Sequence, residues 1–121
     1  MGGGKGGDPE ARVSMKIRLF DGAKLDLAEG FEFYEQQEAG VGDYFLDCLY
    51  SDIDSLMIFA ETHSVRFKEF YCLFSKRFPY AVYYTVEADL ISVHAVLDCR
   101  QNPAGVESRL ASESTRRWES E

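Results

Sequence analysis

KRFPYAVYYTVEADLISVHAVLDCRQNP, residues 76–103, contains two runs of β-branched and aromatic residues, 80–87 and 90–98, separated only by Ala88-Asp89. Two such runs around a short polar interruption predict antiparallel strands joined by a tight turn. Alternation places Ile91, Val93, Ala95 and Leu97 on one face of the second strand. Pro79 stands just before the first strand, where a missing backbone N–H is tolerated. The stretch therefore predicts a β-hairpin.

The segments on either side extend this pattern. Residues 70–74 alternate between two faces and predict a strand before the hairpin, and residues 16–20 predict another near the start of the chain. After the hairpin, Asn102-Pro103 has the residue types of a helix N-cap and a first helical residue. We expect a short helix from there to Leu110, followed by a polar C-terminal tail, residues 111–121.

Two segments with helical periodicity lie between the first strand and the second. Their apolar faces are formed by Ala23, Leu27, Phe31 and Tyr34, and by Phe45, Leu49, Ile53, Leu56 and Ala60. Asp21 is a candidate N-cap, Gly40 a natural stop, and Asp43 a second helix start. We expect an α+β fold of order β-α-α-β-β-β-α, in which an antiparallel sheet of three to four strands packs against an N-terminal α-helical hairpin.

Length and composition predict one domain. A chain of 121 residues that is 45% hydrophobic can bury a core without disulfides or metal. We expect residues 1–14, which are rich in glycine, to form a flexible leader or tag, and residues 15–110 to form the domain. No signal peptide or membrane-spanning run is visible. Three cysteines without CxxC spacing, Cys48, Cys72 and Cys99, are expected to be small core residues in a reducing cytoplasm. They indicate no metal site or cofactor.

Charge is distributed unevenly along the chain, whose net charge is −8. Residues 21–61 contain eleven acidic residues and one basic residue, Lys24, whereas residues 62–110 contain six basic and five acidic residues. An acidic surface repels phosphate, so direct nucleic-acid binding is not expected from the first half. A basic protein partner would suit it better, although solvated helix faces are often acidic without binding anything.

The element order and four local sequences resemble the RelE/ParE superfamily of bacterial toxins, and its ParE branch in particular. The four sequences are Phe31-Glu32-Phe33-Tyr34-Glu35, Gly42-Asp43-Tyr44-Phe45-Leu46, Phe78-Pro79-Tyr80-Ala81-Val82-Tyr83-Tyr84 and Ala95-Val96-Leu97-Asp98-Cys99-Arg100-Gln101-Asn102-Pro103. The resemblance covers residues 15–110. It implies a small cytoplasmic toxin of a type II toxin–antitoxin system, often encoded on plasmids or other mobile DNA and neutralised by a cognate antitoxin.

The resemblance leaves two activities to be separated: RelE-like members cut mRNA on the ribosome, whereas ParE-like members inhibit DNA gyrase. RNA cleavage needs cations that stabilise the charge developing on phosphorus. Ala81 stands where RelE-like enzymes have an arginine, and residues 70–74 contain no lysine. His94 is the obvious candidate base, but a half-exposed sheet histidine explains it as well, and His63 fits a turn. The chain is therefore predicted not to be an enzyme.

Five residues are candidates for partner binding: Lys76, Arg77, Tyr83, Arg100 and Arg109. The basic pair at the strand turn is also typical of a solubilising loop tip, and the tyrosine of a cross-strand pair. We expect a ParE-like toxin that binds an antitoxin and, as the resemblance implies, DNA gyrase; a homodimer is left open. The alternatives are a RelE-like ribosome-dependent endoribonuclease and a non-toxic interaction or dimerisation module of the same fold.

Overall fold

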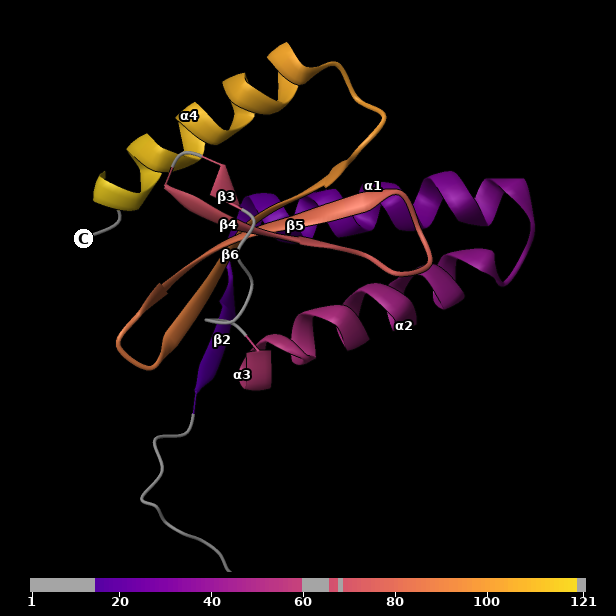
Figure 1. The fold of residues 1–121 in the computed structure, drawn as a ribbon. Coiled ribbons are helices and arrows are strands. Elements are labelled where there is room, and N and C mark those ends of the chain that lie inside the picture. Colours follow the sequence, from indigo (N-terminus) through magenta and orange to yellow (C-terminus); the bar gives the residue numbers. More distant parts are fainter. Residues whose placement is uncertain (1–14, 60–65, 68, 120–121) are drawn as a thin grey trace, which may run out of the picture.

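The structure is a computed structural model that describes residues 15–59, 66–67 and 69–119. A five-stranded sheet of order β2-β6-β5-β4-β3 lies between a helical hairpin, α1 and α2, and the C-terminal helix α4 (Figure 1). The elements are β2 (Lys16–Leu19), α1 (Asp21–Gln37), α2 (Val41–Asp54), α3 (Leu56–Phe59), β3 (Arg66–Phe67), β4 (Phe70–Phe74), β5 (Tyr80–Glu87), β6 (Leu90–Asp98) and α4 (Pro103–Glu119). The predicted α+β class and element order are confirmed.

The sheet is mixed, which corrects the expectation of an antiparallel sheet. Strands β3 to β6 are antiparallel to their neighbours, but β2 pairs parallel to β6, with Lys16 opposite Leu90 and Leu19 opposite Val93. Helices and three other strands separate β2 from β6 in the chain, so no tight turn forces this pair to be antiparallel. The two-residue strand β3 was not predicted, because two residues show no periodicity.

The helical hairpin was predicted, and its turn is capped across the two helices. Gly40 has φ +94°, in the left-handed region that favours glycine. The Glu35 carboxylate of α1 accepts hydrogen bonds from the backbone N–H of Gly40 at 3.0 Å and of Gly42 at 2.9 Å. Helix α2 consequently starts at Val41, before the predicted Asp43. The expected continuous helix to residue 60 is broken at Ser55, whose hydroxyl donates to the Asp52 carbonyl.

The main core lies between the hairpin and one face of the sheet. Its fully buried members include Leu27 of α1, Phe45 and Leu49 of α2, and Val82 and Tyr84 of β5. These residues recur at helical and strand spacing in the sequence, so burial of one face of each element follows from the pattern. This confirms that the hairpin covers the sheet.

A bulge in β6 corrects the predicted face of this strand. The register passes from Tyr83 opposite Ala95 to Tyr84 opposite Val93, so that His94 has no opposite residue in β5. Val93 therefore packs under the hairpin, while Ala95 and Leu97 pack on the other face. The sequence shows an unbroken apolar alternation here, and nothing in it marks the bulge.

Helix α4 covers the second face, where Leu110 packs with Phe70, Ala95 and Leu97. It begins as expected, with the Asn102 side chain accepting the Ala104 N–H at 2.8 Å. It does not end at Leu110 but continues to Glu119, because it keeps burying side chains such as Glu113 against the body. No helix in the described part of the chain is long and apolar enough to cross a membrane.

Candidate partner-binding sites

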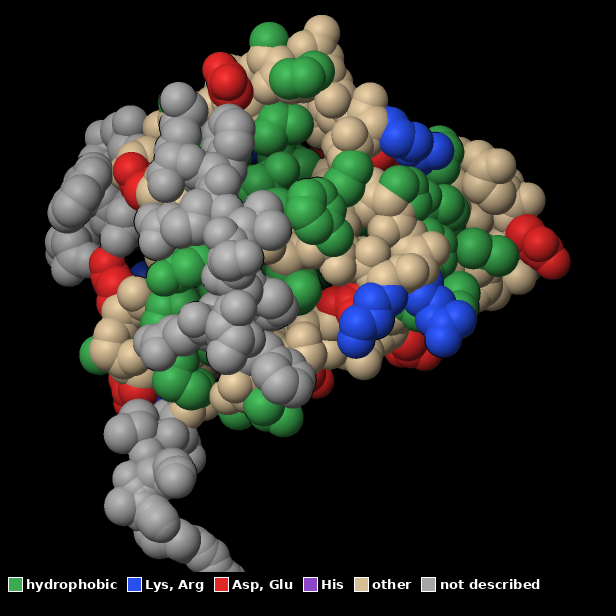
Figure 2. Space-filling model, in the orientation of Figure 1, with side chains coloured by type: hydrophobic (Ala, Val, Ile, Leu, Met, Phe, Trp, Pro, Cys, Tyr) green, Lys and Arg blue, Asp and Glu red, His purple; other side chains and the backbone are tan. Residues whose placement is uncertain are grey.

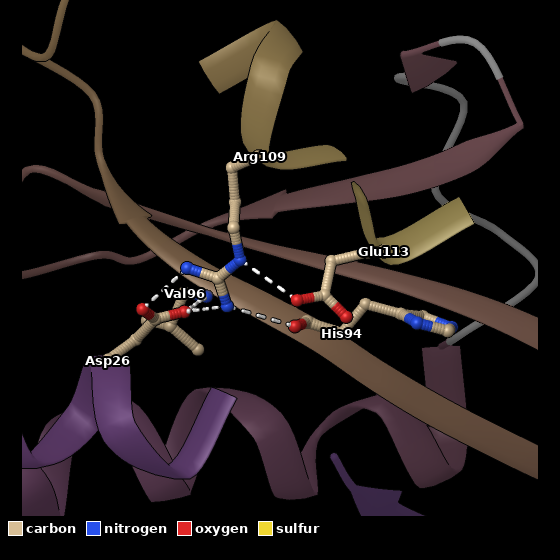
Figure 3. Close-up of polar contacts among 5 residues, drawn as sticks. All are labelled: Asp26, His94, Val96, Arg109 and Glu113. Atoms are coloured by element: carbon tan, nitrogen blue, oxygen red, sulfur yellow. Dashed lines mark hydrogen bonds and ion pairs between the residues drawn. The ribbon is translucent and has the colours of Figure 1, made fainter. Parts of the chain in front are cut away.

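The outer edge of β6 is where α1 and α4 meet. Strand β2 pairs with β6 only as far as Val93, and the backbone beyond it needs other partners. The Asp26 carboxylate of α1 accepts the Val96 N–H at 2.9 Å, and the Arg109 guanidinium of α4 reaches the His94 carbonyl at 3.4 Å. Figure 3 shows these contacts side by side. Two side chains thus replace the missing continuation of β2.

Arg109 is the centre of this network. Its guanidinium forms two 2.8 Å hydrogen bonds to the Asp26 carboxylate, and its Nε donates to Glu113 at 2.9 Å (Figure 3). The Glu113 side chain is 1% exposed and that of Arg109 is 24% exposed. Burial alone would lower the pKa of Arg109, but the two carboxylates raise it above its usual value. Arg109 was predicted to bind a partner, and the structure shows that most of its donors are used within the fold.

A hollow of about 300 Å³ opens beside this network. It is lined by Asp26, Glu29, Gly30 and Phe33 of α1, by Tyr80, by residues 96–98 and Gln101, and by Arg109. The Phe33 side chain is 49% exposed at its rim. Burial raises the pKa of Tyr80 to about 12, so its hydroxyl is neutral and can donate a hydrogen bond at pH 7. The sequence did not single out Asp26, Glu29 or Phe33; the only signal of the network was the i,i+4 spacing of Arg109 and Glu113.

His94 is fully buried, which corrects the expectation of a half-exposed histidine. Its Nε2 lies 3.0 Å from the Thr85 hydroxyl. The imidazole also makes edge-on contacts with Phe20 at 4.4 Å and Phe70 at 5.2 Å between ring centroids. A ring enclosed in this way is inaccessible to a substrate, so its role is structural.

Lys76 and Arg77 lie exposed in the turn between β4 and β5, opposite acidic residues of α2. They line a hollow of about 400 Å³ together with Tyr44, Asp47, Cys48, Ser51 and Asp52. The buried Asp52 carboxylate accepts the Ser75 hydroxyl at 2.8 Å and fixes the turn to the helix. In Figure 2, basic side chains lie over this turn with acidic ones close by. The pair is therefore presented to solvent in a fixed position, and its use in partner binding stays a prediction.

Tyr83 lies on the face of the sheet that α4 covers. It is half-buried and hydrogen-bonded to Cys72, and burial raises the pKa of Tyr83 to about 12 and that of Cys72 to about 11. A tyrosine engaged in this way contributes to the second core as well as to the surface. Cys99, expected in the core, is exposed.

A groove of about 450 Å³ runs along the outer side of the hairpin. Its floor is apolar and its rim carries charge; the lining residues are Lys24, Leu27, Ala28, Phe31, Glu32, Asp43, Leu46 and Tyr50. The Tyr50 side chain is 43% exposed, and Leu25 nearby in sequence is 64% exposed. An apolar groove between two helices, lined by two carboxylates and one lysine, has the shape and net charge that an amphipathic basic helix can fill.

A comparison with solved structures identifies the fold. A chain from "Chromosomal ParDE TA system from P. aeruginosa" superposes with a TM-score of 0.63, at 14% sequence identity, over 69% of this chain and 95% of that chain. The chain has a ParE-type toxin fold. At this identity the likeness concerns the fold. No family model matches the sequence, and no curated protein matches it.

Ala81 of this ParE-type fold lies inside the sheet, whereas Arg100 follows the end of β6. Ala81 is buried on the α4 side of the sheet, opposite Leu97. Arg100 binds the Asp98 carboxylate at 2.8 and 3.0 Å, and Asp98 lies opposite Tyr80, which faces the hairpin. The Arg100 guanidinium lowers the pKa of Asp98. Arg100 and Arg109 are each engaged with carboxylates instead. Among the described residues, no group of three or more His, Cys, Asp or Glu could hold a metal ion.

Proposed function

We propose that this chain is the ParE-like toxin of a type II toxin–antitoxin system, acting in the cytoplasm by binding other proteins. The observation that carries the proposal is the fold, which it shares with a chain of a chromosomal ParDE system over almost the whole of that chain. Ala81, in place of a phosphate-binding arginine, supports protein binding over RNA cleavage. The target that the resemblance implies is DNA gyrase.

The helical hairpin is the proposed docking surface for the antitoxin. Its outer groove combines an apolar floor with Glu32, Asp43 and Lys24 at the rim, and Lys24 is the only basic residue among residues 21–61. Burying Leu46 and Tyr50 would supply hydrophobic free energy, and the acidic rim would select a basic amphipathic helix over an acidic one. The antitoxin is therefore proposed to present such a helix.

The basic turn of Lys76 and Arg77 is the proposed contact for the target. It lies at the end of a hairpin fixed by Asp52 and Ser75, so little conformational entropy is lost when a partner binds there. Both side chains are exposed, and charge at the rim of an interface mainly accelerates association. Tyr83 and Arg100 are kept as secondary candidates.

A supercoiling assay with purified DNA gyrase tests the proposed activity. The protein should inhibit supercoiling at micromolar concentration, and a variant with Lys76 and Arg77 both changed to serine should inhibit less, especially at low ionic strength. Unimpaired supercoiling at this concentration would contradict gyrase as the target. Primer extension on translating ribosomes separates the alternative, because specific mRNA cuts would show a RelE-like endoribonuclease.

Co-purification tests the antitoxin surface. The product of a small reading frame that adjoins the gene should form a complex with the chain, and Tyr50→Asp should weaken it. Phe74→Asp is the matched control, because Phe74 is similarly exposed, at 53%, but lies on β4 away from the groove. Equal weakening by both variants would show that the hairpin groove is not the docking surface.

A further inference from the structure

The outer edge of β6 continues past the contacts of Asp26 and Arg109. The Cys99 N–H donates to the Pro79 carbonyl. Because the direction of the backbone N–H and C=O groups alternates along a strand, those of Leu97 point toward β5, and those of Val96 and Asp98 point away from it. The Val96 N–H is taken by Asp26, and the Asp98 carbonyl accepts the Gln101 N–H at 3.1 Å. The Val96 carbonyl and the Asp98 N–H remain, and no hydrogen bond from a described residue reaches them. An edge with one free acceptor and one free donor can pair with another chain.

These two groups are spaced for a parallel β-bridge. In a parallel ladder, a residue forms hydrogen bonds with two neighbours of the residue opposite it: the carbonyl of the preceding one and the N–H of the following one. Strand β2 pairs in this way with the earlier part of β6. A segment placed opposite Leu97 would therefore continue the line of β2. The residue next to the bridging one would direct its side chain toward the hairpin, because neighbouring side chains in a strand point to opposite faces.

The hollow lies on that side of the strand, and its lining selects positive charge. It contains three carboxylates, those of Asp26, Glu29 and Asp98, against the single guanidinium of Arg109. Asp26 and Asp98 are already in ion pairs, whereas Glu29 is exposed and forms none with a described residue. Phe33 and Tyr80 provide aromatic rings beside it, and aromatic faces attract guanidinium and ammonium groups. The same charges disfavour phosphate.

We propose that this edge binds an extended segment of a protein partner through one parallel β-bridge to Val96 and Asp98, with an adjoining arginine or lysine side chain in the hollow against Glu29, Phe33 and Tyr80. The free backbone pair fits a polypeptide, and the exposed Glu29 carboxylate favours a basic residue in it. This site is separate from the hairpin groove and does not depend on the proposed toxin activity.

A titration of the ¹⁵N-labelled full chain with blocked tripeptides tests the inference. Acetyl-Val-Arg-Val-amide should shift the Asp98 amide proton downfield, as expected for a new hydrogen bond, and should shift the amides of Glu29 and Phe33. Acetyl-Val-Gln-Val-amide should bind more weakly, and acetyl-Val-Glu-Val-amide should bind weakest. Glu29→Gln should weaken the arginine peptide by about two- to fivefold, as for a partly exposed ion pair, and should leave the glutamine peptide unchanged.

Glu32→Gln is the matched control, because Glu32 is an exposed glutamate of the same helix that lines the hairpin groove instead. It should leave arginine-peptide binding unchanged. The inference is overturned if the Asp98 amide does not move at tens of millimolar peptide, if the glutamate peptide binds as well as the arginine peptide, or if the two glutamine variants behave alike. Gyrase inhibition is measured without peptide, so failure of either proposal is distinguishable from failure of the other.

Discussion

Replacing Arg109 with methionine should strongly destabilise the fold. The change removes three hydrogen bonds of 2.8–2.9 Å, and takes the Arg109 guanidinium away from the Glu113 carboxylate, 1% exposed, and the Asp26 carboxylate, 10% exposed. Removing one partner of a buried ion pair typically costs about 3–5 kcal/mol. Because Arg109 also supports the β6 edge through the His94 carbonyl, we expect the upper part of this range.

Urea denaturation followed by far-ultraviolet circular dichroism measures this loss. The midpoint should fall while the slope with urea stays constant, since the amount of surface buried on folding hardly changes. For a domain of this size the melting temperature should drop by about 12 °C or more. Arg100→Met is the matched control: its ion pair with Asp98 is at the surface, and its loss should leave the midpoint unchanged.

A rescue experiment separates two contributions to the destabilisation: the loss of the ion-pair interactions, and the cost of burying carboxylates that no longer contact Arg109. Adding Asp26→Asn and Glu113→Gln to Arg109→Met removes both carboxylates that bind Arg109 in the unmodified chain. The amide oxygen of the introduced asparagine can still accept the Val96 N–H, so most of the stability should return. A loss below about 1 kcal/mol for Arg109→Met, as is typical of a surface pair, would refute the reasoning. So would a triple variant as unstable as the single one.

Three further outcomes are expected. Gly30→Ala should destabilise the fold by about 1–3 kcal/mol despite the better helix propensity of alanine, because its Cβ would lie 2.5 Å from the Phe45 ring. Adding Phe45→Leu should relieve the clash, and a Gly30→Ala variant more stable than the unmodified chain would contradict this prediction. Thr85→Val should cost about 1–3 kcal/mol by removing the hydroxyl that meets Nε2 of buried His94, and unchanged thermal unfolding would count against this contact. Burial raises the pKa of Tyr84 from 10.0 to about 12, so the neutral phenol is favoured in the fold, and stability should be complete below pH 10 and fall as pH rises toward 12. Ionisation of all seven tyrosines at 295 nm with unchanged circular dichroism would exclude it.

The local elements follow closely from the sequence because each carries its own periodicity and boundary signals. The hairpin strands end at Glu87 and Asp98, where the pattern predicted, and Asn102 caps α4 as its residue type indicates. The resemblance to ParE-type toxins likewise depended on local sequences in order, and the structure has the fold that this resemblance implied. The tertiary arrangement was out of reach where a feature depends on contacts between distant segments. The bulge at His94 is one such case, since an apolar alternation looks the same with or without it.

What the sequence by itself determined is the longer helices and strands, the buried faces of α1, α2 and β5, and the acidic character of the hairpin, because these depend on residues near one another in the chain. Only the tertiary structure decided that β2 runs parallel to β6 and that α4 continues to Glu119. It also decided that Asp26 and Arg109, 83 residues apart, cover part of the β6 edge. The physical reason is that backbone groups at a sheet edge form hydrogen bonds with whichever side chains the packed helices place beside them. Spacing along the sequence does not indicate which side chains these are.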